Sequence, residues 1–197
     1  MALATAQGFA LWLAEGTILG GWALAARGQG AQGITQMRQG LAAYRATGGE
    51  VARSYFLGLL AEVYGASGQA EAGLKVLAEA LATAHATGTR FYEAELSRPR
   101  GALLVSPGAG TGGSHSAPAA AKAESCWQPA LAIARRQQAK SWELRAAMSL
   151  ARLWQCQGKR AEAYALLAPV YGWFTEGFDT ADLQEAQTLL SALAPEP

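Results

Sequence analysis

The sequence predicts an all-α fold, a right-handed solenoid of antiparallel helical hairpins of the tetratricopeptide type. Alanine and leucine are the commonest residues of the 197-residue chain, whereas the β-branched residues that favour sheets are scarce. Glycines recur at a fixed spacing along the chain, and one helical segment is apolar on more than one side. Together these features predict about four hairpins and a closing helix.

The segment 139–157 is the strongest helical unit. Gly158 interrupts it, and a second helix-forming run begins directly afterwards, so the pair predicts an α-hairpin. A helix with so wide an apolar surface needs neighbours on two sides, as the inner helix of a stacked repeat has. The apolar positions of this segment are Trp142, Leu144, Ala147, Leu150, Ala151 and Trp154.

An internal repeat of forty residues supports the solenoid. Residues 41–48 (Leu-Ala-Ala-Tyr-Arg-Ala-Thr-Gly) match residues 81–88 (Leu-Ala-Thr-Ala-His-Ala-Thr-Gly). Gly28, Gly68 and Gly108 follow one another at the same interval, and Gly158 comes after fifty residues. The ten extra residues are expected in segment 106–121, which is rich in Gly, Ser and Pro and predicts a flexible loop.

The whole chain, 1–197, is expected to be one helical-repeat domain. Glycine stops separate most of the helices, and Thr180 or Asp179 is the expected N-cap of the last one. The expected helices are 7–27, 31–47, 50–66, 69–87, 91–105, 121–138, 141–157, 160–174 and 180–193.

Three prolines lie inside expected helices. A proline removes one helical hydrogen bond and costs on the order of 3 kcal/mol unless the helix bends or restarts. Because of Pro99, Pro129 and Pro169, we expect bends near Arg98 and Ala168, and a bend or late start near Trp127.

Charge and composition limit the classes of function. The 16 basic and 15 acidic residues are spread along the chain, which argues against nucleic-acid binding. The N-terminal apolar stretch carries Gln7 and Glu15 and lacks the basic start of a signal peptide, so a buried first helix and a cytoplasmic location are expected. Cys126 and Cys156 lack metal-binding spacing and are expected to be buried thiols rather than a disulfide.

No catalytic, cofactor or metal site is expected. His85 and His115 have no recognisable partners, and Glu93 with Glu95 is better explained by the positive end of a helix dipole. The glycine run 108–113 lacks the lysine and preceding strand of a phosphate-binding loop. We therefore expect a non-enzymatic protein.

A binding groove is the better expectation. In a stack of hairpins the first helix of each pair lines the concave face, and Arg145 and Arg152 lie two turns apart on one such helix. Such guanidiniums fit carboxylates of a peptide or small ligand, although salt bridges between repeats explain them equally well. The candidate groove residues are Arg53, Glu95, Arg98, Arg145, Ser149 and Arg152. The chain has no asparagine, which excludes an asparagine-containing carboxylate clamp.

A possible oligomer surface lies near the C-terminus. Most of the six tryptophans are expected in the core, but Trp173, Phe174 and Phe178 stand together before the last helix. If they or the first helix form an exposed apolar patch, two copies can pair as a homodimer.

Four segments carry a resemblance to a known family. They are Gly33 to Leu41 (Gly-Ile-x-x-Met-Arg-x-Gly-Leu), Leu57 to Glu62 (Leu-x-Leu-Leu-Ala-Glu), Leu131 to Arg145 (Leu-Ala-Ile-Ala-Arg-Arg-Gln-Gln-Ala-Lys-Ser-Trp-Glu-Leu-Arg) and Gly177 to Leu183 (Gly-Phe-Asp-Thr-x-Asp-Leu). The chain resembles the C-terminal repeat region of bacterial adenylate or guanylate cyclase–ATPase signalling regulators. This resemblance implies an interaction module of a regulatory protein, with a protein or peptide partner or neighbouring domains. The alternative is an effector-sensing domain that holds a small molecule and is coupled to an ATPase or cyclase head.

Overall fold

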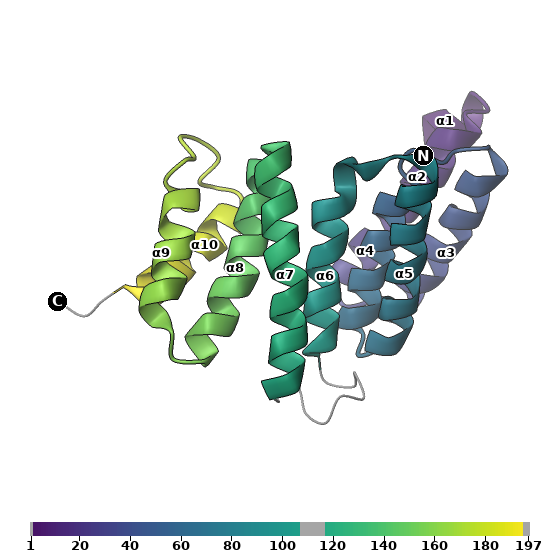
Figure 1. The fold of residues 1–197 in the computed structure, drawn as a ribbon. Helices are drawn as coiled ribbons and strands as arrows, with labels where there is room; N and C mark the ends of the chain where they lie inside the picture. The colour runs from purple at the N-terminus through teal and green to yellow at the C-terminus, as the bar shows by residue number, and fades with distance from the viewer. Residues whose placement is uncertain (1, 107–116, 195–197) are drawn as a thin grey trace.

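The computed structural model describes residues 2–106 and 117–194, and all regular secondary structure within these ranges is helical (Figure 1). The helices are α1 (Ala2–Ala6), α2 (Ala10–Ala26), α3 (Gly30–Ala46), α4 (Arg53–Ala66), α5 (Ala70–Thr87), the 3₁₀ helix η1 (Arg90–Tyr92), α6 (Glu93–Leu104), α7 (Ala117–Gln137), α8 (Lys140–Cys156), α9 (Arg160–Tyr171) and α10 (Ala181–Leu193). The predicted all-α class is confirmed.

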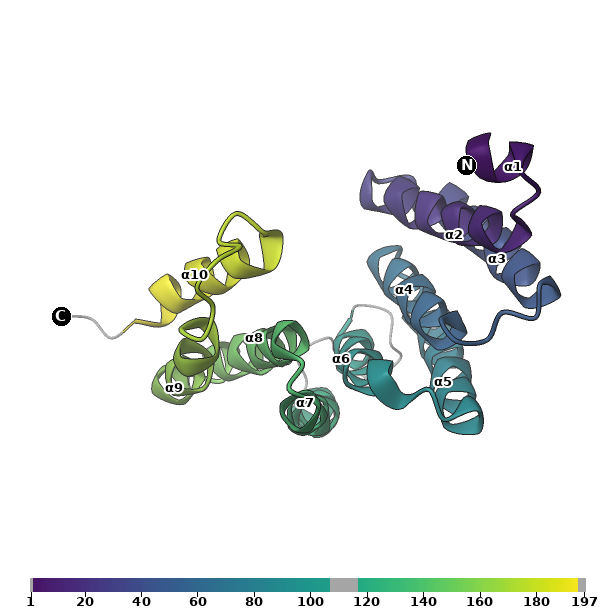
Figure 2. The same ribbon diagram turned by 90° about the horizontal axis from the view of Figure 1, so that it is seen from above.

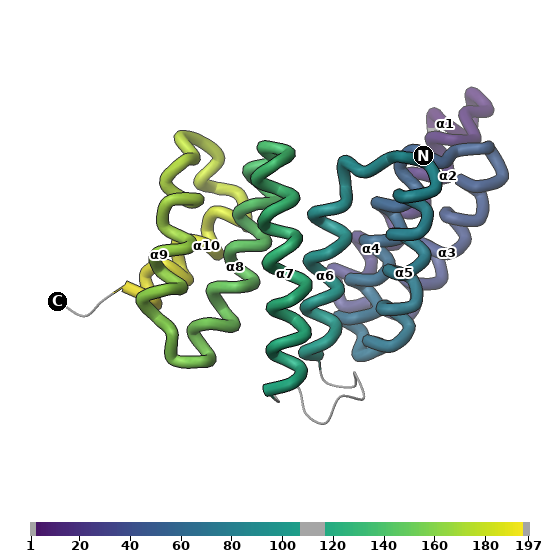
Figure 3. The backbone as a smooth tube through the Cα atoms, viewed as in Figure 1, coloured from purple at the N-terminus to yellow at the C-terminus, as the bar shows by residue number. Residues whose placement is uncertain are grey.

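A left-handed residue follows most of the helices and reverses the chain. At the end of α2, the Gly28 N–H donates to the Ala25 carbonyl at 2.9 Å and the Gln29 N–H to the Leu24 carbonyl at 3.0 Å. This pattern is a Schellman cap, which requires the positive φ that glycine adopts without strain. Figure 3 shows how short the resulting turns are. Left-handed φ angles occur at Gly8, Gly28, Gly48, Gly68, Gly88, Gln138, Gly158 and Gly177.

The spacing of these turns is half the period seen in the sequence. From Gly8 to Gly88 the left-handed residues are twenty apart, and Gln138 and Gly158 have the same separation. One turn therefore follows each single helix of about 17 residues, and the forty-residue repeat contains two such helices. Gly108, which belongs to the same series, lies outside the described residues.

Gln138 is the only non-glycine residue with positive φ in the described ranges, at φ 54°. We expect Gln138→Gly to raise the free energy of unfolding by about 0.5–1 kcal/mol. The left-handed conformation costs an L-residue about 1–2 kcal/mol, and glycine avoids this cost. Part of the gain is offset, because glycine loses more backbone entropy on folding. Urea denaturation measures this change. Gly158→Ala is the matched control and should lower the stability by a similar amount; a neutral Gln138→Gly would show that this turn carries no strain.

The helices pack with their neighbours along the chain into a curved array. The closest packing is between α2 and α3, α4 and α5, α6 and α7, and α8 and α9. Seen from above, α4, α6 and α8 lie on the inner side of the curve, α5, α7 and α9 on the outer side, and α2 and α10 at its two ends (Figure 2). We call the surface formed by α2, α4, α6, α8 and α10 the inner face.

The core is divided into three adjoining clusters. The first lies between α2, α3 and α4, the second between α4, α5 and α6, and the third between α7, α8, α9 and α10. Helix α4 contributes to two of them, and Val105 at the end of α6 packs against the third. Trp127 of α7 is buried, and its indole N–H donates to the Arg98 carbonyl of α6 at 2.8 Å. Packing between neighbours thus continues along the described helices.

Several expected boundaries are wrong. The expected helix 7–27 begins only at Ala10, because a turn at Gly8 separates it from the short helix α1, and α4 begins at Arg53 rather than near residue 50. The expected loop 106–121 is wrong at its end, because residues 117–121 belong to α7; this stretch contains four alanines, and its Pro118 stands in the first turn of the helix, where proline is tolerated. The rest of that loop, 107–116, lies outside the described residues.

The prolines do not end their helices. Residues 93–104, 117–137 and 160–171 are continuous helices through Pro99, Pro129 and Pro169, so the late start near Trp127 is wrong. Pro169 stands in the last turn of α9, so the one backbone hydrogen bond that it removes lies at the end of the helix. At the start of α10, Thr180 occupies the expected N-cap position, but its hydroxyl donates to the Gly177 carbonyl at 2.7 Å instead of accepting from a helix N–H.

None of the described helices combines the length and the apolar character needed to cross a lipid bilayer.

Candidate functional site

Five charged side chains from four helices meet on the inner face. We call them the ionic cluster, and they are Glu62 of α4, Glu95 and Arg98 of α6, Arg145 of α8 and Asp182 of α10. Their helices are successive members of the inner row, although the residues are up to 120 positions apart in the sequence. The cluster shows that these helices present their polar sides to one common surface.

Arg98 lies at the centre of the cluster and is the most buried of its cations. Its guanidinium donates to both oxygens of Glu95 at 3.0–3.2 Å and also pairs with Glu62. Its side chain is 14% exposed. Burial alone lowers the pKa of Arg98, but the two carboxylates outweigh that effect and raise the pKa above its ordinary value. Arg98 is therefore a permanent cation whose neighbours are anions.

Arg145 extends the cluster from α8 to both sides. It pairs with Glu95, its Nη2 lies 3.9 Å from Glu62 Oε1, and its Nε lies 3.8 Å from Asp182 Oδ2. The inter-repeat pairing that the sequence left open as an alternative for Arg145 is therefore present. Two of the predicted groove arginines already have carboxylate partners, and three carboxylates face two guanidiniums in the cluster.

We expect Arg98→Met to lower the free energy of unfolding by about 3 kcal/mol, because it removes a nearly buried cation that bonds both oxygens of the buried Glu95 and also pairs with Glu62. Arg145→Met should cost only about 1 kcal/mol, since its side chain is 32% exposed and water screens its pairs. Urea denaturation compares the two variants. In the double variant Arg98→Met/Glu95→Gln the losses should not add; additive losses would show that the two side chains are not coupled.

A row of aromatic rings runs beside the ionic cluster, nearer the N-terminal ends of the same helices. Tyr55 of α4 stacks on Tyr92 with ring centroids 4.6 Å apart, and Tyr92 contacts Trp142 of α8 at 5.7 Å. Burial raises the pKa of Tyr55, and Tyr92, Glu62 and Glu95 act in the same direction against Arg145. The tyrosine therefore lies within electrostatic reach of the cluster. Sequence reasoning missed this row, because its members come from three separate segments.

Helix α2 adds a carboxylate and an indole to the inner face. Glu15 and Trp22 are seven residues apart and so share one side of the helix. Burial raises the pKa of Tyr92, and the charges of Tyr44 and Glu15 act in the same direction. Trp22 is 42% exposed, and with Glu62 it lines a pocket of about 490 Å³.

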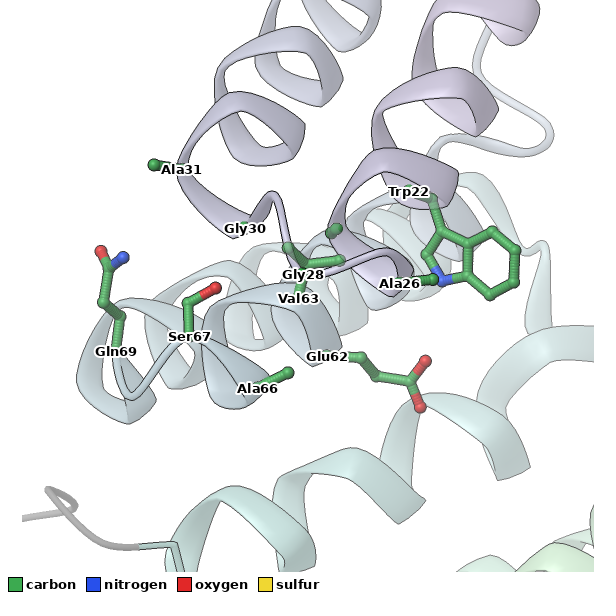
Figure 4. Close-up of a pocket in the computed structure, with 11 residues that line it drawn as sticks. Trp22, Ala26, Gly28, Gly30, Ala31, Glu62, Val63, Ala66, Ser67 and Gln69 are labelled. Atoms are coloured by element: carbon green, nitrogen blue, oxygen red, sulfur yellow. The ribbon is translucent and has the colours of Figure 1, made fainter.

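Figure 4 shows this pocket between the end of α2 and α4. Trp22 and Glu62 lie toward one side, and Ser67 and Gln69 toward the other. Alanines and Val63 form much of the remaining lining. An aromatic ring, a carboxylate and small apolar groups together suit a cationic side chain with an aliphatic stem.

A second pocket, of about 370 Å³, lies between α6, α7 and α8, and three predicted groove residues line it. They are Arg98, Ser149 and Arg152. The Ser149 hydroxyl donates to the Arg145 carbonyl at 3.0 Å, and Arg152 pairs with Glu185 of α10 at 2.7 Å. Both side chains of that ion pair are at least half exposed.

Arg53 is not part of the inner face, so its placement in the groove is wrong. It donates to the Thr83 hydroxyl at 2.8 Å and pairs with Glu79, both on the outer helix α5. Arg53 is the first residue of α4, and its side chain extends toward α5 instead of toward the inner face. Its role in the structure is to join α4 to α5.

The predicted oligomer surface is only partly exposed. Trp173 and Phe178 are about half exposed, whereas Phe174 packs against the third core cluster. The Trp173 ring lies under the Lys140 ammonium at 5.6 Å. Near the other end, Leu3, Phe9, Trp12 and Leu19 are also exposed. Pairing of two copies stays a prediction for either end.

Glu143 fixes the start of α8, which carries Arg145 and Arg152. It accepts hydrogen bonds from Lys140 at 2.7 Å and Arg135 at 3.0 Å, and it is 4% exposed. Burial alone raises the pKa of Glu143, but the bonds to Lys140 and Arg135 outweigh it, so the pKa lies below its ordinary value. Its ionised form therefore stabilises the fold.

We expect this stabilisation to be complete above the ordinary glutamate pKa of about 4.3 and to be lost as the pH falls through the lower folded pKa. Glu143→Gln should therefore be less stable than the wild type near neutral pH and closer to it in acid. Urea denaturation across this pH range measures the difference. Glu71→Gln, on the exposed side of α5, is the control, and a constant gap between wild type and Glu143→Gln at all pH values would contradict the assignment.

Other sequence expectations concern residues away from the inner face. His85 is exposed, and Glu93 pairs with Arg90. Both cysteines are free, but the expectation that both are buried is wrong, because Cys156 is exposed near the end of α8. His115 and the glycine run 108–113 lie outside the described residues. Within the described ranges, no group of three or more His, Cys, Asp or Glu side chains is arranged to hold a metal ion.

No protein-family model matches the chain, and no curated protein sequence matches it significantly. The resemblance to cyclase–ATPase regulators therefore stays a prediction.

Proposed function

We propose that this chain is a non-enzymatic, tetratricopeptide-like interaction module that binds an extended segment of a partner protein along its inner face. The observation that carries the proposal is the ionic cluster. Arg145 reaches carboxylates on α4, α6 and α10, so four inner helices share one polar surface. Repeat proteins use such continuous concave surfaces for binding.

The charge balance of the inner face favours a basic segment. Its carboxylates are Glu15, Glu62, Glu95, Asp182 and Glu185, and its guanidiniums are Arg98, Arg145 and Arg152. Each of the three arginines already pairs with at least one of these carboxylates. The acidic excess would attract lysine or arginine side chains of a partner, rather than the carboxylates that the arginines alone would select.

The aromatic row gives the same surface its apolar contacts. Tyr55, Tyr92 and Trp142 form a connected line across three helices, and Trp22 stands beside Glu62 on the α2 side. Aromatic side chains are frequent anchors in protein interfaces, and their faces also attract cations. A segment that alternates basic and apolar residues would satisfy both rows. In this proposal the chain serves as a recognition part of a signalling regulator, as its family resemblance implies.

Selection from a random peptide library displayed on phage tests the proposal. We expect the enriched peptides to carry lysine or arginine together with apolar residues, and Tyr92→Ala and Glu15→Gln each to weaken a selected peptide by roughly fivefold or more, measured by fluorescence anisotropy. Tyr92→Ala removes one aromatic ring from the inner face, and Glu15→Gln removes one negative charge.

The matched controls are Tyr164→Ala on the outer helix α9 and Glu71→Gln on α5, both exposed. They should leave the affinity unchanged. Enrichment of acidic peptides would contradict the basic partner, and equal losses in the inner and outer variants would contradict the inner face as the binding surface.

A further inference from the structure

The pocket between α6, α7 and α8 has the composition of a small-molecule site. Its volume of about 370 Å³ falls in the usual range for ligand pockets. Ala102 and Val105 from the α6 side, Ala120 and Trp127 from α7, and Leu153 from α8 give it apolar walls. Small residues on α6 and α7 leave the space, and the Trp127 ring is held in place by its bond to the Arg98 carbonyl.

The charged side chains that line this pocket are both positive. Arg98, Ser149, Arg152, Cys156 and Gln157 complete its lining, and none of the lining residues that the structure describes is a carboxylate. The apolar pocket thus differs from the acidic centre of the inner face, although the two are adjacent. A ligand with a negative group is favoured here, and a cationic one is disfavoured.

Arg152 is the cation that can exchange its partner. The charge of Arg98 is compensated by two carboxylates, Glu95 and Glu62, which its Nε and Nη2 contact, whereas Arg152 pairs with one carboxylate among the described residues, Glu185. Both side chains of that ion pair are exposed to solvent, so breaking the pair costs at most about 1 kcal/mol. A ligand carboxylate that replaced Glu185 would regain a charge-assisted hydrogen bond next to the apolar walls.

The position of the pocket limits the charge of its ligand. It lies toward the C-terminal ends of α6 and α8, as Val105, Cys156 and Gln157 in its lining show. The C-termini of α6 and α8 carry a partial negative charge, and the first turn of α7, which contributes Ala120, carries a partial positive one. The helix dipoles therefore add no strong field that would favour the multiple charges of a nucleotide. One available guanidinium fits one negative charge.

We propose that this pocket binds a compact amphipathic monoanion, a carboxylate with an apolar body, whose charged group pairs with Arg152 and whose body contacts Trp127 and Leu153. This site is separate from the partner groove proposed above and does not depend on it.

Isothermal titration with decanoate tests the site, with decanol and decyltrimethylammonium as matched probes. We expect decanoate to bind saturably and the other two probes to bind at least about tenfold more weakly. Arg152→Gln should weaken decanoate binding by the same factor, since a hydrogen bond to a charged group contributes about 1.5–3 kcal/mol. Ala102→Trp, at an exposed helix position that lines the pocket, should block it. Arg136→Gln, on the exposed side of α7, is the control and should bind as the wild type does.

The exposed Cys156 provides a second readout, because a bound ligand should slow its alkylation by iodoacetamide and Ala102→Trp should abolish that protection. The proposal is overturned if decanoate does not bind saturably, if it binds Ala102→Trp as tightly as the wild type, or if the cationic probe binds equally well. None of these outcomes depends on peptide binding, so this site and the partner groove can fail separately.

Discussion

The ion pairs of Arg98 and Arg145 connect the inner helices of the array. Apolar packing joins each helix to its chain neighbours, but the three core clusters are local. The ionic cluster connects α4, α6, α8 and α10 directly. Because Glu95 is buried and Arg98 nearly so, their separation would leave charges without compensation in a poorly hydrated place. Ion pairs therefore connect the inner helices in addition to apolar packing.

The turns set the second constraint. Left-handed residues at intervals of twenty enclose α2, α3, α4, α5 and α8, so positions related by one repeat in these helices reach similar heights. Tyr55 and Trp142 lie near the beginnings of α4 and α8, and Tyr92 lies directly before α6. Glu62, Arg98 and Arg145 follow about one or two turns later. Rows of like chemistry across the helices result from this regularity.

Local signals in the sequence predicted the helices and most turns, because capping glycines and helix propensity act over a few residues. The left-handed turn at Gln138 has no glycine, so no local signal indicated it. The start of α7 was not predicted, because the residues before it are rich in Gly and Pro and indicate a loop. The inner face was predicted only in part. Arg98 and Glu62 are 36 positions apart, and only the packing of α4 against α6 shows that they meet. Arg53, predicted in the groove, lies instead against α5, because helix periodicity alone does not show which neighbour a long side chain follows.

The two proposed sites share a boundary at α8, and this has a physical consequence. A monoanion that takes Arg152 from Glu185 removes one contact between α8 and α10 and leaves Glu185 free to add negative charge to the inner face. The added negative charge favours a basic partner segment. The exchanged ion pair is exposed, so the coupling free energy is limited to about 1 kcal/mol, or roughly a fivefold change in partner affinity. By reciprocity, a basic segment bound at Glu185 would raise the affinity of the pocket for the anion by the same factor. The arrangement of Arg152 between a pocket and a groove is thus sufficient for modest positive coupling without any change in the packing of the helices.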